Sequence, residues 1–184
     1  NDIPDDENKN SIEALYQVQN QNEEEDSKLG KTSDWNLILV NQENKIPDDY
    51  KTNLKEIEKN YEVDERIAKN LENMLKDARK EGLNPIICSA YRSREYQIEL
   101  YNKKVKEYKR QGYNQKTAEE KASTWVAIPE TGEHETGLSV DIVSENYQIL
   151  DEEQEKTKEQ KWLIENCYKY GFILRYPTEK KEIT

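Results

Sequence analysis

Some residue types and patterns are scarce in this sequence, and their scarcity limits what the protein can do. Histidine occurs once among 184 residues, so the chain offers a single imidazole to any metal ion. No run of about 18 apolar residues occurs, which argues against a membrane-spanning helix in this chain. Positive charge is in deficit: the formal net charge is −11, which argues against binding to a nucleic-acid backbone or an anionic membrane surface.

Cysteine is also rare, with two residues in the whole chain. Cys88 and Cys167 could pair in an oxidising compartment. Each lies in an apolar stretch, however, where a buried free thiol is the more common outcome.

The composition predicts one compact domain with a solvated tail, because apolar residues make up 33% of the sequence and charged residues 36%. Residues 1–30 are rich in polar and acidic types, and we expect a disordered acidic leader or stalk there. This leader could follow a signal or anchor of an extracellular protein, or a boundary inside a longer cytosolic chain. We expect the first, and with it an extracytoplasmic monomer whose folded domain covers residues 31–184.

Hydrophobic patterning predicts helices and strands in mixed order. Strands are expected at 35–41, 84–91, 138–143 and 172–176, and helices at 64–81, 93–110, 117–125 and 153–170. The first of these helices has the clearest pattern, with apolar residues at three- and four-residue steps and Gly82 directly after it. Elements mixed in this way predict an α+β domain with a small, mostly antiparallel sheet and flanking helices.

The chemistry centres on a glycine-flanked turn that carries the single histidine. His134 lies in the turn 132–137, and Asp141 follows it within the apolar, alternating run 138–143. Neutral imidazole and a carboxylate both bind zinc, and a catalytic zinc site needs three such ligands and a water. From the residues alone, His134 could instead be a structural histidine, and Asp141 could close a hydrogen bond at a strand end.

Two segments resemble motifs of one enzyme family. The sequence G-E-H-E-T-G-L-S-V-D-I at 132–142 is similar to the zinc-binding segment S-E-H-Q-T-G-L-A-V-D-I of the VanY-like D-alanyl-D-alanine carboxypeptidases. The sequence S-A-Y-R-S-R-E-Y-Q at 89–97 resembles the family's S-G-Y-R-S-x-x-x-Q, and the two segments stand in the family's order. The runs 35–41 and 171–177 also look like the family's opening and late strands, so the resemblance covers roughly residues 33–184.

The resemblance implies a zinc peptidase that acts on peptidoglycan stem peptides, with the zinc site at the sheet. His134 and Asp141 would be two of three ligands to Zn2+, and Arg92 would stabilise the oxyanion of the tetrahedral intermediate. Gln97 and Ser139 would contact the peptide substrate. Without the resemblance, Arg92 would be interpreted as a partner in a surface ion pair and Gln97 as a solvated helix residue.

Two departures from the family pattern matter. The family's serine two positions before the histidine is Gly132 here, which removes one expected hydroxyl contact with the substrate. The family also continues into an E-x-x-H pair that supplies a general-base glutamate and the third zinc ligand, and this sequence has no second histidine. We therefore expect the domain to lack its C-terminal strand, through truncation or cleavage, or the protein to be a degenerate relative.

Three functions are compatible with these residues. We expect a zinc-dependent D-alanyl-D-alanine carboxypeptidase that removes the terminal D-alanine from stem peptides. An L,D-carboxypeptidase that trims tetrapeptide stems shares the motifs, and Gly132 keeps this alternative open. A cell-wall-binding relative without catalysis is favoured by the missing glutamate and histidine, but the retained ligand pair and Arg92 oppose it.

Overall fold

The computed structural model describes residues 35–58 and 60–176, so the expected leader over residues 1–30 lies outside the described part of the chain. The chain divides into two compact units, Asn1–Leu39 and Val40–Thr184, and all helices and strands below belong to the second. Among the described residues, no helix is both long and apolar enough to cross a bilayer.

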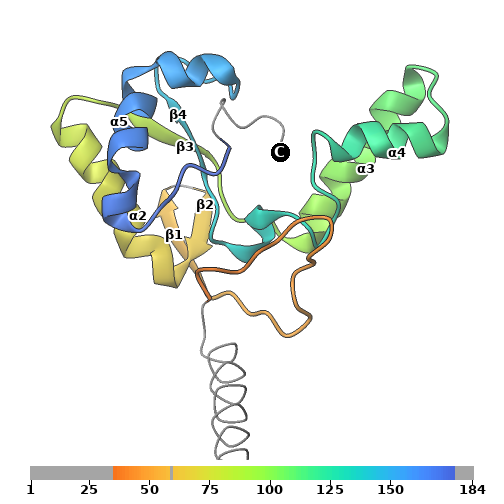
Figure 1. The fold of residues 1–184 in the computed structure, drawn as a ribbon, viewed down its shortest axis with the longest axis horizontal. Helices are drawn as coiled ribbons and strands as arrows, with labels where there is room; N and C mark the ends of the chain where they lie inside the picture. The colour runs from red at the N-terminus through yellow and green to blue at the C-terminus, as the bar shows by residue number, and fades with distance from the viewer. Residues whose placement is uncertain (1–34, 59, 177–184) are drawn as a thin grey trace, which may run out of the picture. The chain divides into compact units, whose positions relative to one another are not determined.

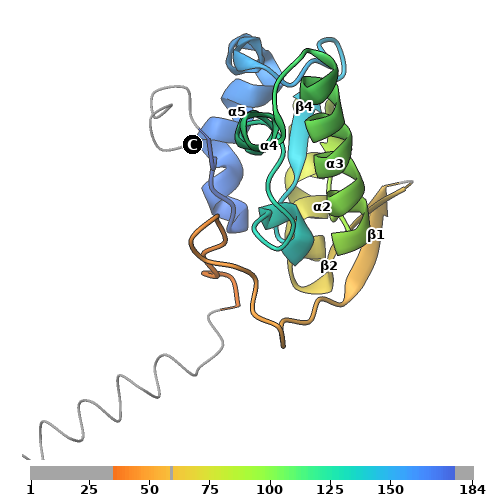
Figure 2. The same cartoon turned by 90° about the vertical axis from the view of Figure 1, so that its right-hand side faces the viewer.

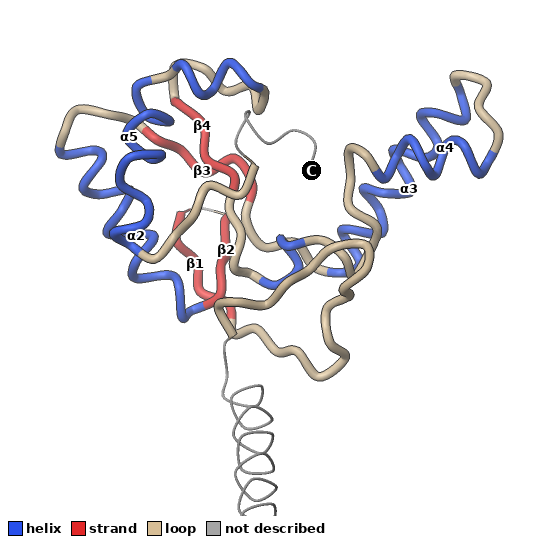
Figure 3. Tube along the Cα trace, viewed as in Figure 1, coloured by secondary structure: helices blue, strands red, loops and turns tan. Residues whose placement is uncertain are grey.

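The described strands form two antiparallel pairs (Figures 1 and 3). Strand β1, Leu54–Glu58, pairs with β2, Tyr61–Asp64, as a hairpin that the sequence did not predict. Strand β3, Pro85–Ser89, pairs with β4, Asp141–Ser144, although more than fifty residues separate them in the chain. This second pair brings the two family-like segments together, because Ser89, the first residue of one segment, pairs with Asp141 near the end of the other.

Helix α2, Glu65–Lys80, supplies half of the buried residues of the main core cluster. Asp64 caps its N-terminus by accepting a hydrogen bond from the amide of Arg66, and Gly82 follows its C-terminus with a φ of 80°. The apolar stripe of α2 packs against residues of β2, β3 and the C-terminal helices. The buried members of this cluster are Val63, Ala68, Leu71, Met74, Leu75, Ile87, Ala90 and Leu163. The predicted helix over 64–81 is confirmed.

Helices α3, Arg94–Arg110, and α4, Gln115–Ser123, pack against each other as a helical hairpin (Figures 1 and 2). Ser93 caps α3, as the sequence predicts, by accepting a hydrogen bond from the amide of Tyr96. A small cluster of Val105, Ala118 and Ala122 holds the two helices together. This cluster is separate from the α2 core, so the hairpin is stabilised by its own contacts.

The C-terminal helical region, predicted as one helix over 153–170, is broken into three pieces. A 3₁₀-helix η2, Glu152–Lys156, precedes α5, Lys158–Asn166, and a second 3₁₀-helix η3, Cys167–Tyr170, follows it. The break occurs at Thr157, whose backbone is extended with a ψ of 156°. Its hydroxyl accepts a hydrogen bond from the backbone amide of Gln160. A capping hydroxyl therefore overrides the apolar periodicity at this point.

The α+β class with antiparallel strands and flanking helices is confirmed, but two predicted strands are wrong. Residues 35–41 form turns and irregular backbone, and the side chain of Asn41 accepts amide hydrogen bonds that close a tight turn. Residues 172–176 also carry no strand. Within the described residues neither run lies beside a partner strand, and β propensity without cross-strand contacts does not make a strand.

The strand predicted over 138–143 begins three residues late, since β4 covers 141–144. The amide of Leu138 donates to the hydroxyl of Thr136 at 3.1 Å, so it is used by the preceding turn and not by a sheet. That turn carries the single histidine.

Candidate metal centre and substrate site

The histidine lies on a short 3₁₀-helix, η1, that covers Glu133–Thr136. The hydroxyl of Thr136 donates to the Glu133 carbonyl at 2.6 Å and closes the turn from within. Gly137 ends it with a φ of 74°, where any Cβ would lie 2.9 Å from Thr52 Oγ1 and 3.0 Å from the amide nitrogen of Asp64. A glycine is thus required here both by the backbone conformation and by the close approach of a neighbouring segment.

His134 and Asp141 converge. The Nδ1 of His134 lies 2.8 Å from the carbonyl oxygen of Ala90, and because a carbonyl only accepts, Nδ1 is the protonated nitrogen. The second ring nitrogen, Nε2, faces Asp141, with 3.2 Å between Nε2 and Oδ2. Asp141 opens β4 opposite Ser89 of β3. In the neutral ring, a proton on Nδ1 leaves the lone pair of Nε2 directed toward this carboxylate oxygen.

This arrangement fits two ligands of a zinc ion. Ligands at about 2.0–2.2 Å in tetrahedral geometry stand roughly 3.3–3.5 Å from each other, close to the separation of Nε2 and Oδ2. A backbone carbonyl on the second ring nitrogen is the usual outer partner of a zinc-bound histidine, because it fixes the tautomer. Within residues 35–58 and 60–176, no set of three or more His, Cys, Asp or Glu side chains gathers as a complete metal site.

Arg92 lies beside this pair. Its Nε and Nη2 donate to the hydroxyl of Ser89 at 3.1 and 2.7 Å, and its Nη2 is 3.6 Å from Oδ2 of Asp141. The amide of Arg92 also donates to the carbonyl of His134 at 3.2 Å. The guanidinium is held beside His134 and Asp141, so its ion pair is with one of the two candidate metal ligands and not with an arbitrary surface carboxylate.

Gln97 is buried in the first turns of α3, with 1% of its surface exposed, so it is not a solvated helix residue. Its Nε2 donates to the carbonyl of Ala127 at 2.8 Å, in the loop that leads to η1. Its Oε1 is buried without a hydrogen-bond partner among the described residues. Such an acceptor is costly unless a ligand supplies a donor.

Glu135 is a buried carboxyl group that the sequence did not single out. Burial raises the pKa of Glu135, although the amides of Glu130 and Gly132 donate hydrogen bonds that favour its charged form. A Cβ at Gly132 would lie 3.3 Å from Oε1 of Glu135 and 3.8 Å from Cδ of Gln97. A side chain at Gly132, the position of the family's serine, would therefore contact both groups.

The segment after η3 returns to the histidine turn. Arg175 Nε lies 2.6 Å from Oε1 of Glu133, and this partner raises the pKa of the Arg175 guanidinium. Burial and the Glu133 carboxylate raise the pKa of the neighbouring Tyr176. The segment 172–176, which was predicted as a strand, is thus held to the histidine turn by the ion pair between Arg175 and Glu133.

Ser139 and the cysteines complete the predicted residues. Ser139 is half-buried between η1 and β4, two residues from Asp141. Cys88 and Cys167 are both free thiols. The expected burial is wrong for Cys88, which is exposed at the point where the register of β3 and β4 shifts, and its Sγ is 3.5 Å from the carbonyl of Asp141.

Sequence reasoning missed the groups that orient the site. The Ala90 carbonyl has no side-chain signature, so only the fold could reveal it. Ser89 and Glu135 lie inside the two family-like segments, where their position beside Arg92 and His134 was a usable signal.

Comparisons with known proteins agree with this geometry. The sequence profile of the VanY family, described as D-alanyl-D-alanine carboxypeptidase, matches residues 60–184. A D-alanyl-D-alanine carboxypeptidase of Enterococcus faecalis (strain ATCC 700802 / V583) is 41% identical over 155 residues, which cover 84% of this chain and 56% of the relative. The chain thus spans about half the length of that relative.

Solved structures give the same relationship. A crystal structure of the vancomycin resistance D,D-pentapeptidase VanY in complex with Zn(II) is 42% identical, with a TM-score of 0.69 over 82% of each chain. VanYB in complex with D-alanine-D-alanine is 42% identical, with a TM-score of 0.70 over 82% of this chain and 80% of the other. On this family match, identity and shared fold, the chain belongs to the VanY family of D-alanyl-D-alanine carboxypeptidases.

Proposed function

We propose that this protein is a zinc-dependent carboxypeptidase that removes the C-terminal D-alanine from peptidoglycan stem peptides. The observation that carries the proposal is the convergence of His134 Nε2 and Asp141 Oδ2, 3.2 Å apart, with Arg92 beside them in a member of the VanY family. The relative bound to Zn(II) and the one bound to D-alanine-D-alanine support the same metal and the same substrate class.

His134 and Asp141 would hold the metal as two of its ligands. A zinc ion bound there would lower the pKa of a bound water to about 7 and polarise the scissile carbonyl. The resemblance implies that a glutamate and a further histidine act as base and third ligand, and His134 is the one histidine in this sequence. The residues present would therefore supply two of the three protein ligands and fix the orientation of the histidine.

Arg92 would stabilise the oxyanion that forms when water attacks the amide. Two of its nitrogens are fixed on Ser89, and Nη2 stays within 3.6 Å of Asp141, so the positive charge is oriented before the substrate arrives. Removal of a preorganised donor of this kind typically costs about 10²–10³ in kcat. Arg92→Lys keeps the charge but loses the fork, so we expect a loss in this range.

Gln97 and Ser139 would bind the peptide substrate. The buried Oε1 of Gln97 is an acceptor for a substrate N–H, and Nε2 is held on Ala127 so that Oε1 stays oriented. The half-buried hydroxyl of Ser139 lies close to Asp141 in the chain. Gly132 leaves the space next to Gln97 without a hydroxyl, and this difference bears on substrate preference.

The place of action follows from the substrate. Peptidoglycan stem peptides lie outside the cytoplasmic membrane, so the proposal includes an extracytoplasmic location. We also propose a monomer, which light scattering of the purified protein would test. A mass equal to that of a dimer would contradict the proposed monomer but would not bear on the proposed carboxypeptidase activity.

The decisive experiment incubates the natural full-length protein and zinc with pentapeptide and tetrapeptide stems, and reads the products by mass spectrometry. We expect the pentapeptide to lose one D-alanine, and a chelator or His134→Ala to abolish the loss. Consumption of the tetrapeptide instead would favour the L,D-carboxypeptidase. If zinc binds and both peptides survive, the carboxypeptidase proposal fails, and retention on purified cell wall would then support the non-catalytic relative.

A further inference from the structure

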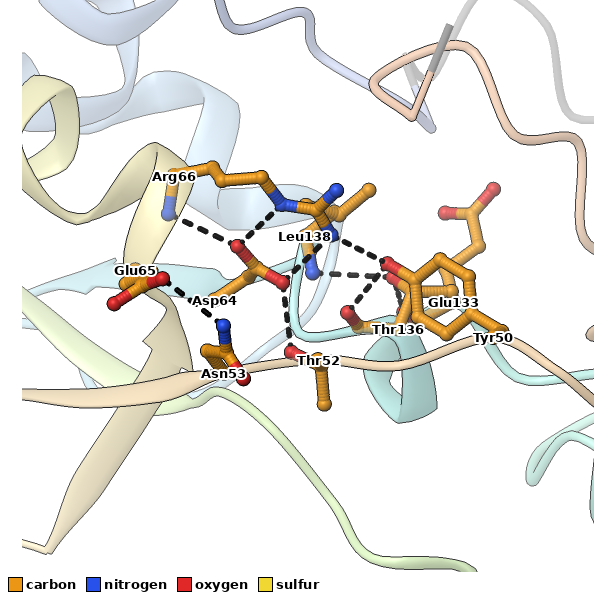
Figure 4. A network of polar contacts seen from close by, with 9 residues as sticks. All are labelled: Tyr50, Thr52, Asn53, Asp64, Glu65, Arg66, Glu133, Thr136 and Leu138. Carbon is orange, nitrogen blue, oxygen red and sulfur yellow. Dashed lines mark hydrogen bonds and ion pairs between the residues drawn. The ribbon is translucent and has the colours of Figure 1, made fainter. Parts of the chain in front are cut away.

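A carboxylate whose two oxygens both accept hydrogen bonds lies next to the end of the histidine turn. Asp64 is fully buried at the junction of β2 and α2. Its Oδ1 accepts hydrogen bonds from N and Nε of Arg66 at 2.9 and 2.8 Å, and its Oδ2 accepts from Arg66 Nη2 and Thr52 Oγ1, both at 2.8 Å (Figure 4). Four hydrogen-bond donors fix the position of the Asp64 carboxylate, so Asp64, Arg66 and Thr52 form a rigid cluster.

The C-terminal end of η1 is held to this cluster through two consecutive backbone carbonyls, those of Thr136 and Gly137. The hydroxyl of Tyr50 donates to the carbonyl of Thr136 at 2.9 Å, and Arg66 Nη2 lies 3.5 Å from the same hydroxyl. The amide of Asp64 donates to the carbonyl of Gly137 at 2.9 Å. Figure 4 shows Tyr50 and Arg66 meeting beside Thr136.

The histidine itself is held by the loop that connects β3 to α3. The amide of Arg92 donates to the His134 carbonyl, and the Ala90 carbonyl accepts from the His134 ring. His134 is therefore held between two anchors, of which one contacts its ring and its carbonyl and the other holds the carbonyls of Thr136 and Gly137. Each anchor restrains the turn that carries His134.

We propose that Tyr50, fixed by the Asp64–Arg66 pair, is a positioning residue for the imidazole of His134. It touches neither the metal-ligand pair nor the substrate-binding residues, and acts through the backbone of Thr136. Metal ligands must be held within about 0.5 Å of their productive position, and outer groups that orient them are typically worth 10–100-fold in metal affinity. This inference rests on the proposed function, in which His134 binds zinc.

The test compares two tyrosines that each lose one hydroxyl. Tyr50→Phe removes the contact with Thr136, whereas Tyr170→Phe removes a hydrogen bond of 2.8 Å to Asp77, on the far side of the α2 core. Because the chain has a single histidine, ¹⁵N-histidine labelling reports on the His134 ring alone. Zinc titration followed on the same signals gives an apparent Kd.

We expect wild type and Tyr170→Phe to give one Nδ1-protonated tautomer and the same zinc Kd. Tyr50→Phe should give a mixture of tautomers or broadened ring signals, and a zinc Kd about tenfold higher. Ring signals and Kd of Tyr50→Phe equal to those of Tyr170→Phe would overturn the inference. If zinc leaves the Nε2 signal of the wild type unchanged, the metal role of His134 fails, while the tautomer comparison still decides the positioning role.

If Tyr50→Phe does not fold, a second variant, Arg66→Lys, tests the same inference. Arg66→Lys retains the positive charge next to Asp64 but loses the two-nitrogen fork that also reaches Tyr50. The same change in the ring signals is expected, in a smaller proportion of the molecules. A folded Arg66→Lys protein with wild-type ring signals would contradict the role of the Asp64–Arg66 pair.

Discussion

Helices α2 and α3 have nearly the same length, 16 and 17 residues, yet they serve the protein in different ways. Five residues of α2 are buried, all of them apolar and on one stripe. In α3 the buried residues are Gln97 and Val105, one near the site and one in the hairpin with α4. The difference shows that α2 is a scaffold for the whole domain, whereas α3 places one polar side chain at the site.

The largest effect should come from the scaffold. Leu71 is completely buried in α2, so Leu71→Ala should lower the free energy of unfolding by about 3 kcal/mol. Val105 packs only in the smaller hairpin cluster, and Val105→Ala should cost about 1 kcal/mol. Urea unfolding measures both values. Equal losses would mean that the hairpin and the α2 core are one cooperative structure with no difference in packing.

The N-terminal cap of α2 should give the next largest effect. Asp64→Asn leaves Arg66 without its charged partner, and we expect a loss of roughly 2 kcal/mol at pH 7. Burial opposes ionisation of Asp64, but hydrogen bonds from Arg66 and Thr52 prevail and lower its pKa.

The lowered pKa of Asp64 fixes the pH dependence of this effect. The folded state binds the proton less readily than the unfolded state, so the stabilisation is present above the unfolded pKa of about 3.9. It is lost as the pH falls through the folded pKa, so the difference between Asp64→Asn and wild type should shrink below about pH 4. On α3, Glu107→Gln breaks an exposed pair with Lys104 and should change stability little at any pH. A constant difference for Asp64→Asn between pH 7 and 3.5 would refute the assignment.

The buried amide of α3 should affect activity more than stability. Gln97→Leu should lower kcat/KM about tenfold, mainly by raising KM, because it removes the proposed acceptor for substrate. The free energy of unfolding should change little, since loss of the hydrogen bond to Ala127 is offset by removal of a buried Oε1 without a partner. Gln115→Leu, at an exposed position of α4, is the control. A wild-type KM with a strongly destabilised protein would show that Gln97 has a packing role only.

The smallest effect should come from the surface of the hairpin. Lys121 Nζ lies 4.8 Å from the ring centre of Tyr113 and 6.0 Å from that of Tyr108. Cation–π contacts at exposed sites contribute about 0.5 kcal/mol, so Lys121→Gln should lower the thermal midpoint slightly. Lys116→Gln, which makes no such ring contact among the described residues, should leave the midpoint unchanged. Identical thermal midpoints for both variants would show that the cation–π contacts of Lys121 do not contribute to stability.

The sequence predicted the elements whose pattern is strong over many residues. The apolar stripe of α2 and the serine cap of α3 were predicted correctly, because each is a local property of the chain. The strands expected at 35–41 and 172–176 were wrong, and the hairpin of β1 and β2 was missed, because L-K-E-I-E is too charged to suggest a strand. Strand formation depends on a partner, and the sequence of one segment does not contain that information.

The sequence by itself determined the chemical inventory of the site. It placed one imidazole, one carboxylate and an arginine in two segments that resemble a known family, and those residue types suit zinc and an oxyanion. Only the tertiary structure decided how they meet. The pairing of β3 with β4 brings Asp141 to His134, the carbonyl of Ala90 selects the ring tautomer, and burial turns Gln97 from a solvated residue into a buried acceptor. These outcomes depend on contacts between residues far apart in the chain, and local patterns of hydrophobicity and charge carry no record of such contacts.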